Sequence, residues 1–329
     1  MDIELTGALQ GAKLHKWKAF LSRLGLEAEA QVERTCLIWE DDQLIATGSR
    51  QDNLLKCIAV DELHQGEGLT ATLLTQLRQD AFANGHTHLF LYTKPKNNYM
   101  FSSLFFYPVA QTEQVLLMEN QKNGIQDFLK DLPVPCKEGK IGAAVMNCNP
   151  FTRGHRYLIE TAAKECDHLY IFVLSEDKSE FRAYDRMEMV KLGTRDLPNV
   201  TVLPTGPYLI SSATFPTYFL KERDKAENIH CLLDIEIFCK YFVPKFGITD
   251  RFVGTEPLSP MTNMYNEALT AHLPKKGIRL SQIPRLEETG TPISASAVRS
   301  CLDTGDKDTL RALVPETTYE YLRTHDFLK

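Results

Sequence analysis

A seven-residue segment in the middle of the chain has the composition of an anion-binding turn. Residues 149–155 read N-P-F-T-R-G-H and follow an apolar run at 141–146, with an amphipathic helical pattern after them. A strand that turns into a helix exposes the free N–H groups of the helix start, which favour a phosphate. Gly154 allows a ligand close to the backbone, while Thr152 and His155 offer side-chain donors. The pattern predicts phosphate binding, although a glycine–histidine pair alone is more often an ordinary turn.

A second pattern of the same kind lies near the end of the chain. Residues 293–299 read I-S-A-S-A-V-R, with Ser294 and Ser296 ahead of a predicted helix and Arg299 about one turn further on. Hydroxyls and backbone donors at a helix start can hold the β- and γ-phosphates of a nucleotide, and the planar fork of an arginine suits phosphate better than a lysine does. N-capping is the commoner role of such serines.

The elements that position these segments divide the chain into two α/β domains. A stretch with two prolines, charge and glycine at 131–140 predicts the boundary, so we assign residues 1–130 to the first domain and 138–329 to the second. In the second domain strands alternate with helices, which predicts a doubly wound, Rossmann-like parallel sheet that binds ligands beyond the carboxyl ends of its strands. The strand patterns lie at 141–146, 169–174, 200–203, 251–254 and 278–283, and the helical patterns at 155–165, 183–195, 235–246 and 264–272.

The first domain is predicted to be a set of strands around one prominent helix, which spans 69–81 and ends at Asn84-Gly85. The strand patterns lie at 36–39 and 44–47, as a hairpin, and at 54–60 and 89–93.

The loop that opens this helix reads Q-G-E-G-L-T at 65–70. It resembles the (Q/R)-x-x-G-x-(G/A) loop of the GCN5-related acetyltransferase family, where a helix start binds the pyrophosphate of coenzyme A. The resemblance implies that a coenzyme A-like group binds here, although a threonine stands where that family has a smaller residue. No general base for acetyl transfer stands out, so a binding role without catalysis stays open. The implied binding residues are Gln65, Gly66, Gly68 and Thr70.

The two anion-binding patterns together resemble the nucleotidyltransferase superfamily. T-R-G-H at 152–155 is similar to its (H/T)-x-G-H signature, and residues 293–299 are similar to its I-S-S-T-x-x-R. The resemblance implies attack on the α-phosphate of ATP, loss of pyrophosphate, and Mg²⁺ held mainly by phosphate oxygens. It assigns catalysis to Thr152, His155 and Arg299. The implied ATP-binding residues are Asn149, Pro150, Phe151, Gly154, Ser294, Ser296, Lys178, Arg182 and Arg186. For the last three, a solvated, mixed-charge helix start is an equally good interpretation.

The order of the two domains, with T-E-P at 255–257 and T-N-M-Y-N at 262–266, makes the whole chain similar to the citrate lyase ligase family. This resemblance implies acetylation of a thiol on the acyl carrier subunit of citrate lyase. Acetate and ATP would form acetyl adenylate, with release of pyrophosphate and then AMP. The prosthetic group of the carrier is similar to dephospho-coenzyme A, so the first domain is expected to hold that arm. Cys148, beside the first motif, is expected to be structural.

The composition narrows the class of protein further. A net charge of −6 argues against binding to nucleic acid, and the apolar runs are too short to cross a membrane. The eight cysteines form no C-x-x-C pair, and the N-terminus has no signal-peptide pattern. A cytoplasmic protein with reduced thiols is expected. Two other functions stay open: an adenylyltransferase that makes a nucleotide cofactor, and a regulatory protein that senses acetyl-coenzyme A.

Overall fold

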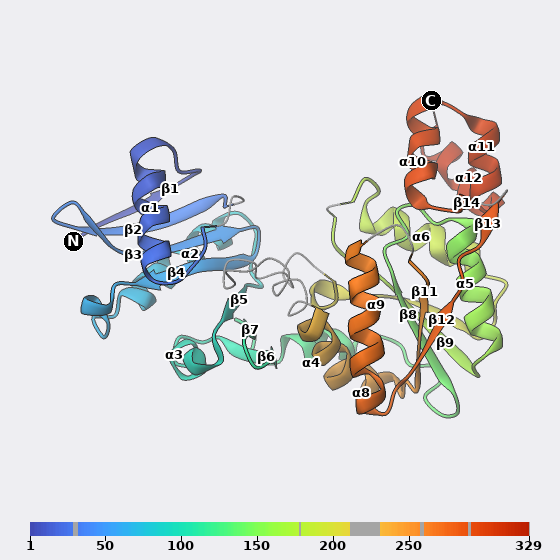
Figure 1. The fold of residues 1–329 in the computed structure, drawn as a ribbon, viewed down its shortest axis with the longest axis horizontal. Coiled ribbons are helices and arrows are strands. Elements are labelled where there is room, and N and C mark those ends of the chain that lie inside the picture. Colours follow the sequence, from blue (N-terminus) through green and yellow to red (C-terminus); the bar gives the residue numbers. More distant parts are fainter. Residues whose placement is uncertain (29–31, 178, 211–230, 257–259, 289–290, 329) are drawn as a thin grey trace. The chain divides into compact units, whose positions relative to one another are not determined.

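Two compact units make up the computed structural model of the chain (Figure 1). The first comprises Met1–Asp127 with Ala213–Glu236, and the second Phe128–Ser212 with Ile237–Lys329. The division falls just before the proline-containing stretch, and the predicted domain limits stay a prediction. The structure describes residues 1–28, 32–177, 179–210, 231–256, 260–288 and 291–328.

The first unit is built on a mixed sheet with a helix packed on each face. Its strands lie in the order β1-β2-β3-β4-β5-β7-β6. Leu37 of β2 packs with helix α1 and the adjacent Ile38 with helix α2, so the two helices cover opposite faces. The bounds are β1 Asp2–Thr6, α1 Gly11–Arg23, β2 Arg34–Glu40, β3 Gln43–Gln51, β4 Leu54–Val60, η1 Glu62–His64, α2 Leu69–Ala83, β5 Phe90–Thr93, η2 Pro95–Asn97, α3 Asn98–Ser103, β6 Tyr107–Gln111 and β7 Leu116–Glu119. The next helix, α4 Gly124–Lys130, contains the division between the two units. The predicted hairpin, strands and helix are confirmed.

Strands β4 and β5 are parallel neighbours that pair at one end only. Leu54 lies opposite Phe90, and Leu55 lies opposite Leu91. Among the described residues, β4 and β5 do not pair beyond these positions, although β4 continues to Val60. The strands therefore separate toward their carboxyl ends, and a space opens between them beside the start of α2.

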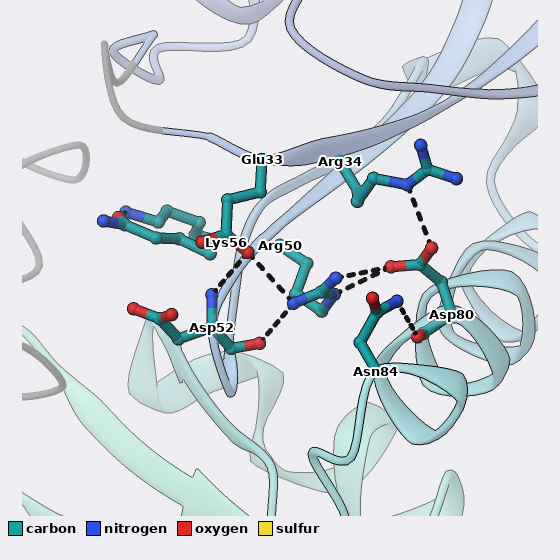
Figure 2. Close-up of polar contacts among 8 residues, drawn as sticks. Glu33, Arg34, Arg50, Asp52, Lys56, Asp80 and Asn84 are labelled. Carbon is teal, nitrogen blue, oxygen red and sulfur yellow. Dashed lines mark hydrogen bonds and ion pairs between the residues drawn. The ribbon is translucent and has the colours of Figure 1, made fainter.

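A buried ion pair ties α2 to the sheet (Figure 2). The guanidinium of Arg50 on β3 donates from Nε and Nη2 to one carboxylate oxygen of Asp80 on α2, at 2.9 and 2.7 Å. Arg34 donates to the other oxygen at 2.9 Å, and Glu33 accepts from Arg50 Nη1 at 3.2 Å. Only 3% of the Arg50 side chain and 6% of that of Asp80 are exposed. This pair fixes the C-terminal half of the helix whose other end borders the space beside β4.

The second unit is a doubly wound parallel sheet, as predicted (Figure 1). Its strand order is β10-β9-β8-β11-β12. Strands β9 and β10 therefore lie on one side of β8, and the later strands β11 and β12 lie on the other. The order reverses between β8 and β11, which is where such sheets bind their ligands. The bounds are β8 Ile141–Met146, α5 Arg153–Lys164, β9 His168–Val173, α6 Ala183–Thr194, β10 Val200–Pro204, η3 Gly206–Tyr208, β11 Asp250–Gly254, α9 Pro260–His272, η7 Pro274–Lys276, β12 Arg279–Ile283, β13 Glu287–Glu288, β14 Thr291–Pro292, α10 Ala295–Thr304, α11 Lys307–Leu313 and α12 Glu316–Thr324.

The helix predicted at residues 235–246 is regular only in part. Instead of one α-helix over 235–246, residues 231–237 are α-helical, Phe238–Phe242 forms a π-helical turn and α8 covers Val243–Phe246. Pro244 has no N–H to donate to the preceding turn, which disfavours a continuous α-helix. Within the described residues, every helix is too short or too polar to span a lipid bilayer.

Candidate functional site

Thr152 and His155 hold each other at the start of α5. The Thr152 hydroxyl accepts the backbone N–H of His155 at 3.3 Å, and the Thr152 N–H donates to His155 Nδ1 at 3.1 Å. Since Nδ1 is an acceptor, the proton of the neutral ring lies on Nε2. Burial and, to a smaller extent, the charge of Arg285 together lower the pKa of His155 to about 4. At neutral pH His155 is therefore an uncharged donor, and no partner for Nε2 is recorded in the described part of the chain.

Helix α10 begins with the second predicted motif. Ser294 is its N-cap and accepts the backbone N–H of Ala297 at 3.1 Å. This is the capping role that the sequence left open, and the hydroxyl proton of Ser294 is still free to be donated. Ser296 lies within the first turn of the helix rather than ahead of it, is exposed, and accepts from Arg299 Nη2 at 3.2 Å.

The two motifs meet in space. Arg299 Nη1 donates to the carbonyl oxygen of Asn149 at 2.6 Å. A Cβ added to Gly154 would lie 3.3 Å from the carbonyl oxygen of Ile293, so the missing side chain lets the two segments pack closely. The starts of α5 and α10 consequently lie together at the carboxyl edge of the sheet, next to the reversal of strand order. Arg299 also pairs with Glu180 at 3.2 Å through Nε.

Two residues expected to touch ATP are buried. Phe151 has no exposed surface, and its ring stacks on that of His155 with centroids 6.0 Å apart. Gly193 on α6 leaves room for it, because a Cβ there would lie 2.3 Å from the Phe151 ring. Pro150, which follows a cis peptide bond, is also buried. Their side chains support the histidine and the turn, and the ATP-binding role expected for Phe151 and Pro150 stays a prediction.

Arg186 is also buried. Its guanidinium is fully buried and donates to the carbonyl oxygens of Phe181 at 3.0 Å, Asn147 at 2.9 Å and Glu176 at 2.5 Å. A further bond reaches Asn147 Oδ1 at 2.6 Å. These donors order the loop after β9, and the phosphate role expected for Arg186 stays a prediction. Arg182 is exposed at the N-cap of α6, and its phosphate role stays a prediction. Lys178 lies outside the described residues.

Asn149 connects the first motif to helix α10 and to the loop after β9. Besides accepting from Arg299, it accepts the backbone N–H of Phe181 through Oδ1 at 3.0 Å. Its side-chain oxygen is therefore engaged with the loop after β9, and its position orders the turn. Cys148 has no exposed surface, and burial raises the pKa of its thiol. A buried, protonated thiol is a poor nucleophile, which agrees with the structural role expected for it.

Sequence reasoning missed a group at the ends of β11 and β12. Arg285, two residues after β12, donates through Nε to the carbonyl oxygen of Thr255 at 2.9 Å and pairs with Glu256. Its positive charge is the second cause of the lowered pKa of His155, after burial. Arg285 belongs to neither motif. The one available signal was its place directly after a strand that ends at the ligand-binding edge.

The described residues contain no group of three histidine, cysteine or acidic side chains placed to hold a metal ion. Magnesium that arrives with ATP needs no such protein cage, because phosphate oxygens and water supply most of its ligands.

A cavity of 640 Å³ fills the space between β4 and β5 in the first unit. The backbone of Gly66 and Gly68 has φ values of +91° and +79°, which favour glycine, and Gly68 is the N-cap of α2. The far side of the cavity includes the exposed Lys94 and Lys96. All the residues predicted to bind a coenzyme A-like arm line this one cavity: Gln65, Gly66, Gly68 and Thr70.

Comparison with known proteins identifies the family. A profile described as the citrate lyase ligase C-terminal domain matches residues 141–322. The chain belongs to the citrate lyase ligase family. A second profile, that of the GNAT acetyltransferase family, matches residues 8–101, a range that holds most of the residues that line the cavity.

Curated members of the citrate lyase ligase family match nearly the whole chain. The citrate (pro-3S)-lyase ligase of Klebsiella pneumoniae is 41% identical, over 92% of this chain and 90% of the relative. That of Escherichia coli K12 is 39% identical, over 95% and 91%. That of Haemophilus influenzae is 37% identical, over 94% and 95%. The chain is thus an enzyme of a ligase family, with an acetyltransferase-like domain before the parallel sheet.

Proposed function

We propose that this chain is an ATP-dependent acid–thiol ligase that transfers the acetyl group of acetate to the prosthetic thiol of the citrate lyase acyl carrier subunit. The hydrogen bond from Arg299 to the Asn149 carbonyl supports this proposal, because it joins two anion-binding helix starts into one site. Membership of the citrate lyase ligase family supplies the substrate class.

In the first step an acetate oxygen attacks the α-phosphorus of ATP. The bond from the α-phosphorus to the bridging oxygen breaks, pyrophosphate leaves with that electron pair, and acetyl adenylate forms. Acetate and triphosphate repel, and unit charges ~4 Å apart cost about 1 kcal/mol in water and several times more where water is excluded. The Nε2–H of His155, the guanidinium of Arg299 and the N–H groups that open α5 and α10 are the donors that offset this repulsion.

In the second step the carrier thiol, after losing its proton to solvent, attacks the acyl carbon of acetyl adenylate. The bond from that carbon to the phosphate oxygen breaks, and AMP leaves with the electron pair. The product is an acetyl thioester. No protein cysteine takes part, which fits the burial of Cys148 beside the first motif.

The cavity of the first unit is the site we assign to the prosthetic arm. Its volume of 640 Å³ lies in the range of small-molecule sites. The N–H groups at the start of α2 and the side chains of Lys94 and Lys96 offer positive charge to the phosphates of such an arm. Gln65, Gly66, Gly68 and Thr70 are the residues that would contact it.

The activity is tested by incubating the full chain with MgATP, labelled acetate and deacetylated citrate lyase, and following label into the carrier subunit. We expect one AMP per acetyl group transferred. His155→Ala should abolish both products, whereas His15→Ala, which changes an exposed histidine of α1, should leave them unchanged. Pyrophosphate release that depends on a phosphomonoester and is indifferent to acetate would instead identify an adenylyltransferase that makes a nucleotide cofactor.

The arm site is tested separately with Gly68→Val, which strains a backbone at φ +79° and places a side chain at the cavity wall. Carrier acetylation should fall while acetate-dependent ATP–pyrophosphate exchange is kept. Gly85→Val is the matched control, because Gly85 has a similar φ of +83° and lies outside the cavity lining. Equal loss of acetylation and exchange in Gly68→Val, or equal effects of the two variants, would contradict the arm site.

A further inference from the structure

Exposed apolar side chains lie in the two segments that border the first unit's cavity. Among the described residues, eight large hydrophobic side chains are strongly exposed, and four of them lie in the two short segments that border this cavity. Leu63 is 89% exposed and stands between the lining residues Glu62 and His64. The other three lie on or just after α3: Tyr99 (88%), Met100 (38%) and Phe105 (65%). These four residues are called the apolar rim. Single exposed apolar residues are ordinary, but a cluster of them marks a contact surface.

The backbone at Phe105 strengthens this argument. Phe105 adopts φ +64° at the position after the C-cap of α3, where the N–H of Phe106 bonds to the carbonyl of Phe101 at 3.1 Å. Glycine is the favoured residue at this left-handed position, and a bulky side chain there is disfavoured. The chain nevertheless carries a phenylalanine whose ring is 65% exposed. Local folding does not explain this choice, which favours a role for Phe105 at a contact surface.

Basic and acidic side chains lie on different sides of the cavity. Lys94 and Lys96 are exposed beside α3 and line the cavity. Glu62 and Glu67 are exposed on the opposite side, in the segment that leads into α2. Anionic groups that enter or leave the cavity are therefore favoured on the α3 side, where most of the apolar rim also lies.

We propose that the apolar rim is the docking surface for the folded body of the acyl carrier subunit. This inference rests on the proposed function, in which the thiol sits on a phosphate-bearing arm covalently joined to that subunit. A cavity of 640 Å³ takes a small-molecule-sized arm and excludes a protein. When the arm is inside, the carrier body must lie on whatever surrounds the mouth. The rim offers it an apolar contact, and Lys94 and Lys96 offer charge complementarity where the arm leaves the carrier.

The test uses the full chain with Leu63→Gln, Tyr99→Gln and Phe105→Asn combined. All three side chains are exposed, and asparagine tolerates positive φ, so the variant should fold. Phe82→Gln is the control, since Phe82 is a 46% exposed residue of α2 outside the cavity lining. Three quantities are measured: the KM and kcat for deacetylated citrate lyase, the Kd for free dephospho-coenzyme A, and the rate of acetate-dependent ATP–pyrophosphate exchange.

We expect the triple variant to raise the KM for citrate lyase by about tenfold or more, as loss of a central apolar contact does at other interfaces. Its kcat, its Kd for dephospho-coenzyme A and its exchange rate should stay within twofold of the parent chain, and Phe82→Gln should change none of them. An unchanged KM would overturn the proposal. A Kd that rises as much as the KM would also overturn it, because the rim would then act on the arm alone. Absence of exchange in the parent chain would instead refute the proposed function.

Discussion

Arg299 donates a hydrogen bond of 2.6 Å to the carbonyl oxygen of Asn149, a residue 150 positions earlier in the sequence. Through Nη2 the same guanidinium holds Ser296 in the first turn of α10. The arginine therefore joins the turn after β8 to the start of α10, and it does so where the strand order reverses. A phosphate bound between the two helix starts would meet a guanidinium whose direction is already fixed, so little ordering is left to be done on binding.

The hydrogen bonds from Arg299 to Asn149 and Ser296 predict that even a conservative substitution of this arginine lowers the activity strongly. Arg299→Lys keeps the positive charge but loses the planar fork that contacts Asn149 and Ser296 together. We expect acetate-dependent ATP–pyrophosphate exchange to fall by roughly 10²-fold to 10³-fold, the usual cost of one fixed donor to a reacting phosphate or oxyanion. The control is Arg311→Lys, at an arginine whose side chain is 57% exposed. Exchange within twofold of the parent chain in Arg299→Lys would contradict the assignment.

The second prediction concerns the ionisation of His155. Because its pKa is lowered to about 4, mainly by burial, the imidazole should stay neutral from pH 8 down to pH 5. Histidine in the unfolded chain titrates near 6.5, so the unfolded state takes up the proton first. The stability that neutral His155 contributes is therefore complete above pH 6.5 and is lost as the pH falls toward 4. Nitrogen NMR of the imidazole should show the proton on Nε2.

The substitution Arg285→Gln tests how much a neighbouring charge contributes to the lowered pKa of His155. The charge of Arg285 is the second cause of the lowered pKa, so Arg285→Gln should raise the pKa of His155 and leave it below the usual value. The NMR titration should shift accordingly, with burial still dominant. A His155 ring that titrates near 6.5 in the parent chain would show that the ring is not buried as described.

The third prediction separates two arginines that the sequence grouped together. Arg186→Met leaves the carbonyl oxygens of Asn147, Phe181 and Glu176 without a buried partner, so it should lower the free energy of unfolding by about 3 kcal/mol. Arg182→Ala removes an exposed side chain and should leave stability within about 0.5 kcal/mol. The KM for ATP should rise in Arg182→Ala if this residue binds phosphate. Thermal unfolding and initial-rate kinetics on both variants check the contrast, and a stable Arg186→Met would contradict it.

The fourth prediction concerns the first unit. Asp80→Ala leaves the guanidinium of Arg50 buried without its principal counter-charge, which typically costs 3–5 kcal/mol of stability (an order-of-magnitude value). Both tryptophans of the chain, Trp17 and Trp39, lie in this unit, so tryptophan fluorescence during urea unfolding reports on it alone. The more exposed pair of Lys13 and Glu4, in the same unit, serves as the control, and Glu4→Ala should change stability by less than about 1 kcal/mol.

The sequence alone determined the chemistry-bearing motifs and the type of fold. The alternation of apolar strands with helices predicted a doubly wound sheet, because parallel strands buried on both faces leave a clear apolar signal. The glycines of residues 65–70 and the capping residues Thr152 and Ser294 have local causes, since backbone conformation and helix-end hydrogen bonding are decided within a few residues. The apolar pattern missed the short edge strands β1 and β6, which expose several of their residues.

Only the tertiary structure decided which charged and apolar side chains reach the site. Arg186 and Arg182 stand four residues apart, yet one is buried on carbonyl oxygens and the other is exposed. Phe151 lies beneath His155 because Gly193, on a different helix, leaves room for it. Arg285, just after the end of another strand, lowers the pKa of His155 through its charge. Burial and long-range contact depend on packing between distant segments, and the spacing of residues along the chain does not encode that packing.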